Sequence, residues 1–328
     1  MRKNATLLLI DKDQVEALLQ PDDVLAAVGE AFALHSQGEG RVFPVVREKL
    51  SSGAIFGIKS GDIEHQGVLG FKAAGFWANN RASGGEPHQA TIMLFDPETG
   101  RPLCVIDGNI VTTLRTGAAG GLGLMHCARP ESARLCVFGS GVQASIQTRF
   151  ALRVMPNLRE LRYVTFDDRC DARFESGLAA DLVRHGATLV HATDRDEAVA
   201  ASDVVITATP GGGALFSADA VQPGTHLNCV GADTQGKREL PEGLLERVRL
   251  FVDDRNQARE IGESQWAKAL PSITLGDVLT GKTGVDRRPE DITVFDMTGI
   301  ALQDLTVARL ILQKAQARGI GTRVDWPW

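Results

Sequence analysis

The chain has 328 residues, with 35 basic and 41 acidic side chains and a formal net charge of -6 at pH 7. This length exceeds one average domain, so we expect two domains. The acidic balance argues against a nucleic-acid partner, because binding a phosphate backbone requires a basic surface. No apolar run approaches the ~18 residues of a membrane span, so we expect no membrane partner.

The first 127 residues predict an α+β domain. Residues 14–38 have the apolar spacing of two amphipathic helices, and Gly38 is the expected stop of the second. From residue 42 to about 107, short apolar stretches alternate with turns, a pattern typical of an antiparallel sheet. The segment "DPETGR" (96–101) is a hairpin connector. Residues 110–127 predict a helix whose glycines indicate tight packing against another backbone.

After Pro130, strand-like stretches alternate with helical ones, which predicts right-handed crossovers and a parallel sheet. The last part, "TVFDMTGIALQDLTVARLILQKAQARG", predicts a strand, a glycine break and a long helix. The expected fold is therefore α/β, with a doubly wound parallel sheet of the Rossmann type beside the α+β domain. We place the substrate-binding and dimerisation domain at 1–115, completed by 305–328, and the dinucleotide-binding domain at 116–304.

The cysteines and histidines show no metal-binding pattern. The five cysteines are scattered and never form a Cys-x-x-Cys pair, and the seven histidines lack the spacing of metal ligands. We therefore predict no metal and no disulfide framework, and a reducing, cytoplasmic location. Asp11 and Asp13 interrupt the short apolar run near the start, so we expect no signal peptide.

The stretch "CVFGSGVQAS" (136–145) opens the first helix of the alternating region directly after its first strand. Gly139, Gly141 and Ala144 match the G-x-G-x-x-A fingerprint of a dinucleotide site. The first glycine makes the turn, the second admits the pyrophosphate, and the alanine lets the helix pack closely. The amides at the helix start, at Val142 and Gln143, face the diphosphate charge. A plain strand-to-helix turn is the alternative interpretation.

The next predicted strand ends at Asp167 and Asp168. An acid there accepts hydrogen bonds from the adenosine ribose and repels a 2′-phosphate, which favours NAD over NADP. Arg169 follows directly and could bind that phosphate, so NADP stays open. Thr207 and Thr209, in "ITATP", lie at the carboxyl end of a further strand, an edge that borders the ligand crevice in open α/β sheets. Threonines that merely favour strand structure are the alternative.

Four cations of the first domain stand in apolar or small-residue surroundings: Arg47, Lys59, Lys72 and Arg115. A buried cation must be paired or bind an anion, because burying it alone is costly. Each could form a structural salt bridge. Four in one domain, opposite a nucleotide site, favour a pocket for carboxylates. His88, in "EPHQAT", orients substrate or has a structural role.

Asp233, in "NCVGADTQGKREL", follows a predicted buried strand and precedes Gly236. A carboxylate beside the nicotinamide can hold a substrate ammonium or iminium and pass on its proton. A turn-forming aspartate is the alternative, with which the neighbouring glycines are compatible.

Six motifs, in this order, resemble the ornithine cyclodeaminase/mu-crystallin family over residues 40–310: "FKAAGFW", "TTLRTGAAG", "GSGVQA", "DVVITATP", "GADTQGKREL" and "TVFDMTGIALQDL". The resemblance implies a homodimer and nicotinamide-dependent chemistry at the α-carbon of an amino acid. It also implies that Lys72 and Arg115 hold the α-carboxylate, that Arg47 assists them, and that Asp233 acts at the nitrogen. Lys72 and Asp233 are thus the expected catalytic residues. Thr116 matches a family position that contacts the cofactor phosphate.

The family includes cyclodeaminases, alanine dehydrogenases and imine reductases, and the surroundings of Lys72 distinguish among them. An ornithine site needs a carboxylate for the distal ammonium, whereas this chain offers Lys59, Asn79, Asn80 and His88, which suit a second carboxylate. "FPVVRE", "FGIKSG", "HQATIMLFDPETG" and "IGESQ" also resemble the branch that reduces iminosuccinate in the β-hydroxyaspartate route of glyoxylate assimilation.

This resemblance implies NADH-dependent reduction of iminosuccinate, a dicarboxylic imine, to L-aspartate, with Lys59 and His88 near the second carboxylate. Three alternatives stay open. The chain could convert ornithine to proline and ammonia with catalytic NAD. It could be an alanine dehydrogenase or ketimine reductase. It could also bind a nicotinamide nucleotide without turnover, as a mu-crystallin type protein.

Overall fold

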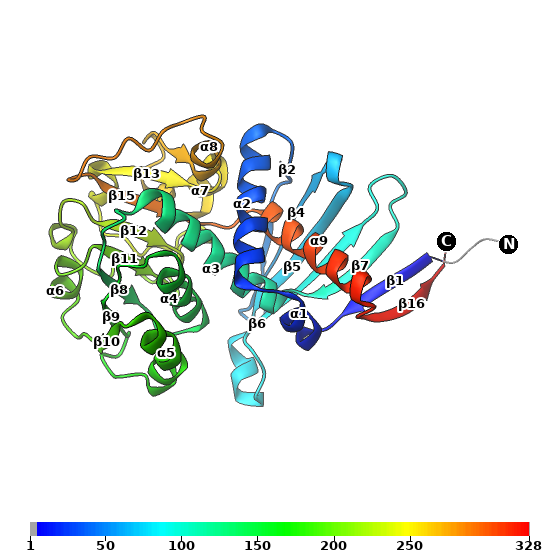
Figure 1. The fold of residues 1–328 in the computed structure, drawn as a ribbon, viewed down its shortest axis with the longest axis horizontal. Coiled ribbons are helices and arrows are strands. Elements are labelled where there is room, and N and C mark those ends of the chain that lie inside the picture. Colours follow the sequence, from blue (N-terminus) through cyan, green and yellow to red (C-terminus); the bar gives the residue numbers. More distant parts are fainter. Residues whose placement is uncertain (1–4, 328) are drawn as a thin grey trace. The chain divides into compact units, whose positions relative to one another are not determined.

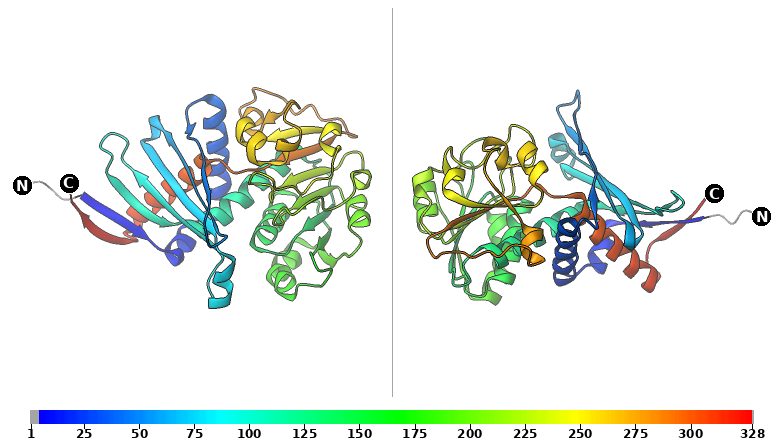
Figure 2. Two further views of the ribbon diagram at one scale, coloured as in Figure 1. Left: turned by 180° about the vertical axis from the view of Figure 1, so that it is seen from behind. Right: turned by 90° about the horizontal axis from the view of Figure 1, so that it is seen from above.

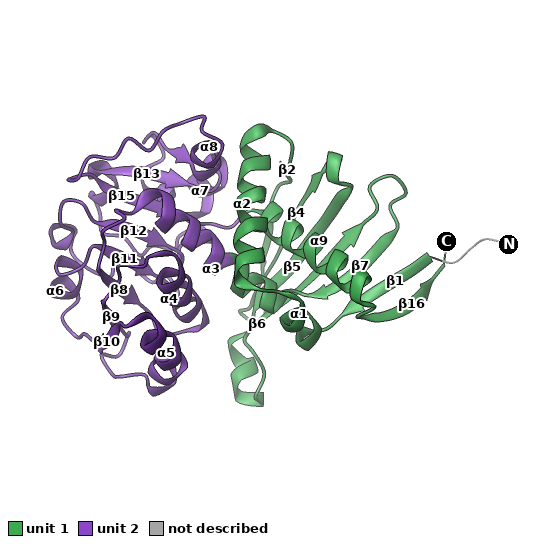
Figure 3. Cartoon of the chain, in the orientation of Figure 1, with its two compact units in different colours: residues 1–115, 300–328 green, residues 116–299 purple. Residues whose placement is uncertain are grey.

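The computed structural model describes residues 5–327, which divide into two compact units (Figure 3). Unit 1 comprises residues 1–115 and 300–328, and unit 2 comprises residues 116–299. Helix α3 (Gly108–Cys127) crosses the first boundary, and Figure 1 labels the elements of both units. The expected α/β fold class is confirmed. Among the described residues, no helix is both long enough and apolar enough to cross a bilayer.

Unit 1 is built on one eight-stranded sheet with helices on one face. Its strands are β1 (Ala5–Ile10), β2 (Arg41–Val42), β3 (Val46–Lys49), β4 (Ile55–Ile63), β5 (Val68–Phe76), β6 (His88–Phe95), β7 (Pro102–Asp107) and β16 (Thr322–Trp326). Its remaining helices are α1 (Lys12–Leu18), α2 (Pro21–Gln37) and α9 (Ala301–Arg318). The strand order is β16-β1-β7-β6-β5-β4-β2, with β3 also paired to β4.

The sheet of unit 1 has one face covered by helices and one open face. Figure 2 shows α2 and α9 together on the covered face. Because side chains alternate along a strand, the register sorts them by face. Ile106, Ile92, Lys72 and Lys59 lie opposite one another on neighbouring strands in one row. The row thus passes from apolar core to paired cations.

The pairing of β1 and β16 is not predicted from the sequence. Strand β1 is parallel to β7 and antiparallel to β16, so the two ends of the chain are joined in one sheet. The central strands β4 to β7 form the antiparallel meander expected from residues 42–107, and the connector "DPETGR" joins β6 to β7.

Unit 2 contains an eight-stranded parallel sheet of order β10-β9-β8-β11-β12-β15-β13-β14. These strands are β8 (Arg134–Phe138), β9 (Glu160–Val164), β10 (Thr188–His191), β11 (Val204–Thr207), β12 (His226–Cys229), β13 (Val248–Val252), β14 (Ile273–Thr274) and β15 (Ile292–Asp296). Its other helices are α4 (Val142–Val154), α5 (Ala172–His185), α6 (Arg195–Ala200), α7 (Arg255–Ile261) and α8 (Leu275–Leu279).

Two hydrophobic cores lie on opposite faces of this parallel sheet. Cys136 and Phe138 of β8 belong to the core that includes residues of α6 and α7. Leu135 and Val137, which alternate with them, belong to the core that includes residues of α4 and α5. Helices on both faces are the hallmark of a doubly wound sheet, so the Rossmann-type prediction is confirmed.

The glycines of α3 permit close packing inside unit 2. A Cβ atom on Gly117 would lie 2.4 Å from the ring of Phe150, and one on Gly120 would lie 1.9 Å from the side-chain oxygen of Gln147. Both partners belong to α4. The close packing predicted for this helix is therefore present, but its partners are side chains rather than the expected backbone.

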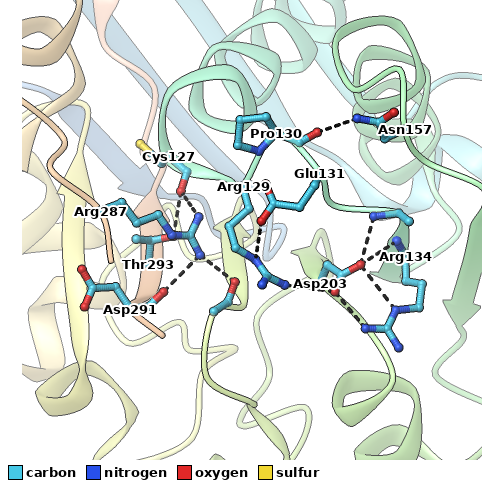
Figure 4. A network of polar contacts seen from close by, with 12 residues as sticks. Cys127, Arg129, Pro130, Glu131, Arg134, Asn157, Asp203, Arg287, Asp291 and Thr293 are labelled. Carbon is cyan, nitrogen blue, oxygen red and sulfur yellow. Dashed lines mark hydrogen bonds and ion pairs between the residues drawn. The ribbon is translucent and has the colours of Figure 1, made fainter. Parts of the chain in front are cut away.

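Arginine side chains fix the amino ends of the parallel strands (Figure 4). Arg129 and Arg134 donate to the carboxylate of Asp203, which precedes β11. Arg287 donates to the carbonyl oxygens of Cys127, Gly224 and Asp291. These arginines are engaged at the edge opposite to the carboxyl ends of the strands, so we assign them a structural role.

Candidate functional site

The loop after β8 is shaped to bring its backbone close to a ligand. Gly139 has a φ of 107°, and a Cβ atom there would lie 2.6 Å from the carbonyl oxygen of Ala208, so only glycine fits without strain. At Gly141 the Cβ position has no atom within 4 Å from the described residues other than Gly141 and its chain neighbours. A side chain would fill this open space, which is where a diphosphate must approach.

The amino end of α4 has donors available for an anion. Gly141 is the N-cap and provides no side-chain cap, so within the part of the chain that the structure describes the first amides of the helix, at Val142 and Gln143, have no intrahelical or side-chain capping partner. The side-chain oxygen of Gln143 is buried and has no hydrogen-bond partner among residues 5–327. Helix amino ends favour anions, so these residues fit the diphosphate of a dinucleotide.

A short polar network holds this loop in place. The Ser140 hydroxyl donates to Asp171, 2.8 Å away, and Asp171 also caps α5 by accepting from the amides of Arg173 and Phe174. The middle residue of Gly-Ser-Gly therefore points to α5, which leaves the flanking backbone for the ligand.

Asp167, Asp168 and Arg169 are all exposed, and the first of them lies three positions after the end of β9 at Val164. Asp168 has a φ of 55°, a left-handed conformation that aspartate tolerates better than most residues. Its carboxylate lies 3.7 Å from the guanidinium of Arg195. The acids follow the strand after the glycine loop, where a ribose-binding acid is required, so they fit the adenosine end of NAD.

The two threonines at the end of β11 are engaged inside the protein. The hydroxyls of Thr207 and Thr209 each donate to Glu239 over 2.7 Å, and the Thr209 amide donates to it over 2.8 Å. Glu239 also accepts from the Gly231 amide after β12. One buried carboxylate thus ties together two neighbouring strand ends.

Glu239 begins a chain of three buried acids that sequence reasoning missed. The Glu239 amide donates to the carboxyl group of Glu263, and the Glu263 amide donates to that of Asp296, which ends β15. Burial, followed by the charge of Asp296, raises the pKa of Glu263 to about 8. Burial also raises the pKa of Asp296 to about 7, and that of Glu239 above its ordinary value. A short sequence motif does not predict that these acids are buried together, because their hydrogen-bond partners are mostly backbone amides, which any residue can supply.

Thr116 and Asp233 belong to unit 2. Thr116 is nearly buried in α3, and its carbonyl oxygen accepts from the side chain of Gln147 in α4. Asp233 follows β12 and is half-exposed; its carboxylate pairs with Lys237 over 2.7 Å and accepts from the Thr234 hydroxyl. The roles expected for these two residues remain predictions.

Unit 1 gathers the candidate cations on one face of its sheet. Lys59 of β4 lies directly opposite Lys72 of β5, and Arg47 of β3 lies opposite Gly57 on the same face. The register of β5 and β6 places His88 on this face as well. Like charges directly opposite each other destabilise a sheet, so this arrangement needs a counter-charge.

That counter-charge is Asp304, in the first turn of α9, which sequence reasoning missed. One oxygen, Oδ1, accepts from Lys72 Nζ at 2.8 Å and from Arg115 Nε at 3.2 Å. Gln303 accepts from Arg115 Nη1 at 3.1 Å. Lys72 is 4% exposed, Arg115 8% and Asp304 1%. The only sequence signal for Asp304 is an acid within the apolar pattern "ALQDL".

The charges of these groups act on one another's pKa values. Burial, and then the charge of Arg115, lowers the pKa of Lys72 to about 8, with Arg47 acting in the same direction. Burial and the charge of Lys72 lower the pKa of His88. Burial acts to raise the pKa of Asp304, but Lys72 and Arg115 outweigh it, and Lys59 also lowers this pKa. The structure thus brings together the five substrate-binding candidates of unit 1. We call Arg47, Lys59, Lys72, His88, Arg115 and Asp304 the cation cluster.

The structure adds no metal centre to these features. Within residues 5–327, no group of three or more His, Cys, Asp or Glu side chains is arranged to hold a metal ion.

Comparisons with known proteins agree with this architecture. The family described as ornithine cyclodeaminase/mu-crystallin matches residues 6–319. Iminosuccinate reductase of Paracoccus denitrificans is 32% identical, covering 97% of this chain and 100% of that protein. Its crystal structure in complex with NAD+ matches with a TM-score of 0.87 over 98% of this chain and 100% of that one. An archaeal alanine dehydrogenase dimer with bound NAD is 30% identical and matches with a TM-score of 0.89, over 98% of this chain and 99% of that one.

Proposed function

Because the chain belongs to the ornithine cyclodeaminase/mu-crystallin family, we propose that it reduces iminosuccinate to L-aspartate with NADH. The reaction class, an NAD(H)-dependent oxidoreductase that acts on C=N or CH–NH2 bonds, agrees with the names of similar proteins, iminosuccinate reductase and alanine dehydrogenase. The choice of NAD(H) as the cofactor agrees with similar solved structures, which contain NAD+ or NAD.

The observation that carries the choice of substrate is the Lys59–Lys72 pair in the cation cluster. Two lysines opposite each other beside Arg115 and Arg47 form an environment that repels a substrate ammonium. A monocarboxylate substrate would need only the cations that bind its one carboxylate, a role that we assign to Lys72, Arg115 and Arg47. A further lysine in the same cluster, Lys59, agrees with a second carboxylate, which iminosuccinate possesses.

The residues of the cation cluster then take separate roles. Lys72 and Arg115, assisted by Arg47, bind the α-carboxylate, and Lys59 and His88 lie near the other carboxylate. Fixing both ends of a small substrate orients its C=N bond, which contributes more to such a reaction than a protein nucleophile would. Asp233 stabilises the protonated imine nitrogen, which makes the carbon more electrophilic.

The nucleotide is assigned to unit 2. The backbone at Gly139 and Gly141 and the amides at Val142 and Gln143 would hold the diphosphate, and Asp167 or Asp168 the adenosine ribose. Thr116, Thr207 and Thr209 stay predicted contacts. When bound, NADH supplies the hydride for the imine carbon. The reaction consumes one NADH and one proton for each aspartate formed.

The direct test mixes the full-length protein with oxaloacetate, ammonia and NADH, and follows the loss of NADH absorbance and the formation of aspartate. We expect aspartate in amounts equal to the NADH consumed. Absence of turnover from mildly acidic to alkaline pH, with turnover of pyruvate and ammonia or of a cyclic imine, would overturn the proposal. Proline formed from ornithine with a trace of NAD would indicate a cyclodeaminase.

We further propose that the chain forms a homodimer through the open face of the unit 1 sheet. Phe71 and Phe95 stand there with ring centroids 5.8 Å apart, in a hollow also lined by Phe43 and Leu69. Val105, Met93 and Phe71 form a row across three strands of this face. Contiguous apolar surface of this kind marks association sites, and the similar alanine dehydrogenase is described as a dimer.

A further inference from the structure

We propose that Asp304 is a positioning residue that keeps Lys72 protonated and holds Lys72 and Arg115 side by side as a receptor for a carboxylate. The inference rests on the proposed function for the identity of the ligand, but not for the state of Lys72. Asp304 acts through the two cations, without a role in the chemistry of its own.

The geometry gives Asp304 control of both cations. A single oxygen, Oδ1, accepts from Lys72 Nζ and from Arg115 Nε, so both donors converge on one point. The neighbouring Gln303 accepts from Nη1 of the same guanidinium. Two acceptors on successive residues of α9 therefore fix the guanidinium plane, and neither of these bonds uses Nη2.

The charges around Lys72 show what Asp304 contributes. Arg47 on β3, Lys59 on β4, His88 on β6 and Arg115 on α3 are the cationic or titratable groups of the cation cluster that face this ammonium. Burial and these positive charges favour the neutral amine. Asp304 is the acid of the cluster, and it favours the ammonium by charge and by a hydrogen bond. Without this carboxylate, Lys72 would lose its proton at a lower pH.

The second oxygen of Asp304 makes a clean substitution possible. Oδ2 is buried and has no hydrogen-bond partner among the described residues. In Asp304→Asn the amide oxygen can keep the position of Oδ1, while the amide nitrogen takes the place of Oδ2. The variant thus removes the charge with little change of shape.

The experiment measures the protonation of Lys72 without any substrate. Full-length wild type and Asp304→Asn are treated with a limiting amount of acetic anhydride between pH 6 and 10, and acetylation of Lys72 is quantified by mass spectrometry. Only the neutral amine reacts, so the midpoint reports the pKa. We expect the wild-type midpoint near pH 8 and a midpoint at least one pH unit lower in the variant.

A second readout uses succinate, a dicarboxylate without a titratable nitrogen, and calorimetry. At pH 7.5 we expect an affinity at least about threefold weaker in Asp304→Asn, because a pKa lowered by one unit from about 8 reduces the protonated fraction of Lys72 about threefold at this pH. The affinity should be partly recovered at pH 6. Because arginine stays charged at all these pH values, Lys72→Arg combined with Asp304→Asn should bind succinate with a nearly flat pH profile. NADH affinity should stay within twofold in every variant, which verifies folding.

The matched control is Glu30→Gln, because Glu30 pairs with Arg309, another ion pair that involves α9. It should leave the acetylation midpoint of Lys72 unchanged. The proposal is wrong if Asp304→Asn keeps the wild-type midpoint, or if it weakens succinate binding equally at every pH. A wild type that reduces a different imine would refute the proposed function, while the acetylation midpoints would still decide the role of Asp304.

Discussion

Lys59 and Lys72 lie directly opposite each other on neighbouring antiparallel strands, on the sheet face from which Lys72 reaches Asp304 of α9. Two like charges directly opposite each other in a sheet destabilise the folded state. Asp304 accepts a hydrogen bond from Lys72, and we take the role of Lys59 to be recognition of a second carboxylate.

Lys59→Met should alter substrate choice more than activity in general. Loss of one charge-assisted hydrogen bond, worth ~1.5–3 kcal/mol, should lower kcat/KM with oxaloacetate and ammonia by about 10- to 100-fold. With pyruvate and ammonia the change should stay within about threefold, because pyruvate has no second carboxylate. Lys49→Met, at an exposed end of β3, is the control. Equal losses for both substrates would contradict the assignment.

Asp167→Ser should weaken discrimination against NADPH. The exposed acid after β9 repels a 2′-phosphate, and Arg169 beside it can bind one once the acid is gone. We expect the ratio of kcat/KM for NADPH to that for NADH to rise at least tenfold, equivalent to ~1.4 kcal/mol. Asp219→Ser removes another exposed acid of unit 2 and should leave the ratio unchanged. If Asp167→Ser also leaves the ratio unchanged, the preference for NADH must depend on other residues of this loop.

Gly120→Ala should destabilise the protein. The new methyl group would collide with the buried side chain of Gln147, which is anchored by its bond to the carbonyl of Thr116. Overpacking of this kind costs ~1–3 kcal/mol. Gly177→Ala, within α5 and with no atom near its Cβ position, should instead stabilise by ~0.5–1 kcal/mol. Denaturant unfolding measures the free energy of unfolding of both variants, and we expect the two changes relative to the wild type to have opposite signs.

The buried acid chain predicts a loss of stability at alkaline pH. Burial raises the pKa of Glu263 to about 8 from an ordinary value of 4.5. Because this pKa is raised in the folded protein, the contribution of Glu263 to stability is complete below its ordinary pKa of 4.5 and is lost as pH rises through about 8. The free energy of unfolding should therefore decline from pH 5 to 9, and Glu263→Gln should flatten this decline.

The control for this measurement is Glu242→Gln, which changes an exposed acid of the same unit. It should reproduce the wild-type slope. A wild-type stability that is constant or rises between pH 5 and 9 would show that Glu263 is ionised in the folded protein.

Phe95→Asp should abolish the proposed dimer. A charge in the aromatic hollow on the open face of unit 1 would have to be buried at an interface without a partner, which is costly. Light scattering should give twice the monomer mass for the wild type and the monomer mass for the variant. Val183→Asp, at an exposed position on α5, should remain dimeric. A monomeric wild type would refute the dimer.

Much of the fold and part of the cation cluster can be predicted from the sequence. The glycine loop, the alternation after Pro130 and the meander of β4 to β7 leave local patterns, as do cations within apolar runs such as Lys59 and Lys72. Asp304 leaves only a weak local pattern, an acid within "ALQDL", and its pairing with Lys72 spans 232 positions of the sequence. Glu239 and Glu263 escape notice for a related reason, since buried acids that mostly bind backbone amides require the tertiary structure to explain them. The pairing of β1 with β16 is likewise non-local.

Unit 1 is assembled from both ends of the chain, whereas unit 2 is one continuous segment. During translation, residues 116–299 can fold as soon as they leave the ribosome, but the sheet of unit 1 must wait for α9. Until Asp304 emerges, Lys59, Lys72 and Arg115 belong to a nascent surface that lacks its neutralising carboxylate and its covering helix. A ribosome that stalls before residue 300 would therefore display a complete unit 2 tethered to an incomplete unit 1.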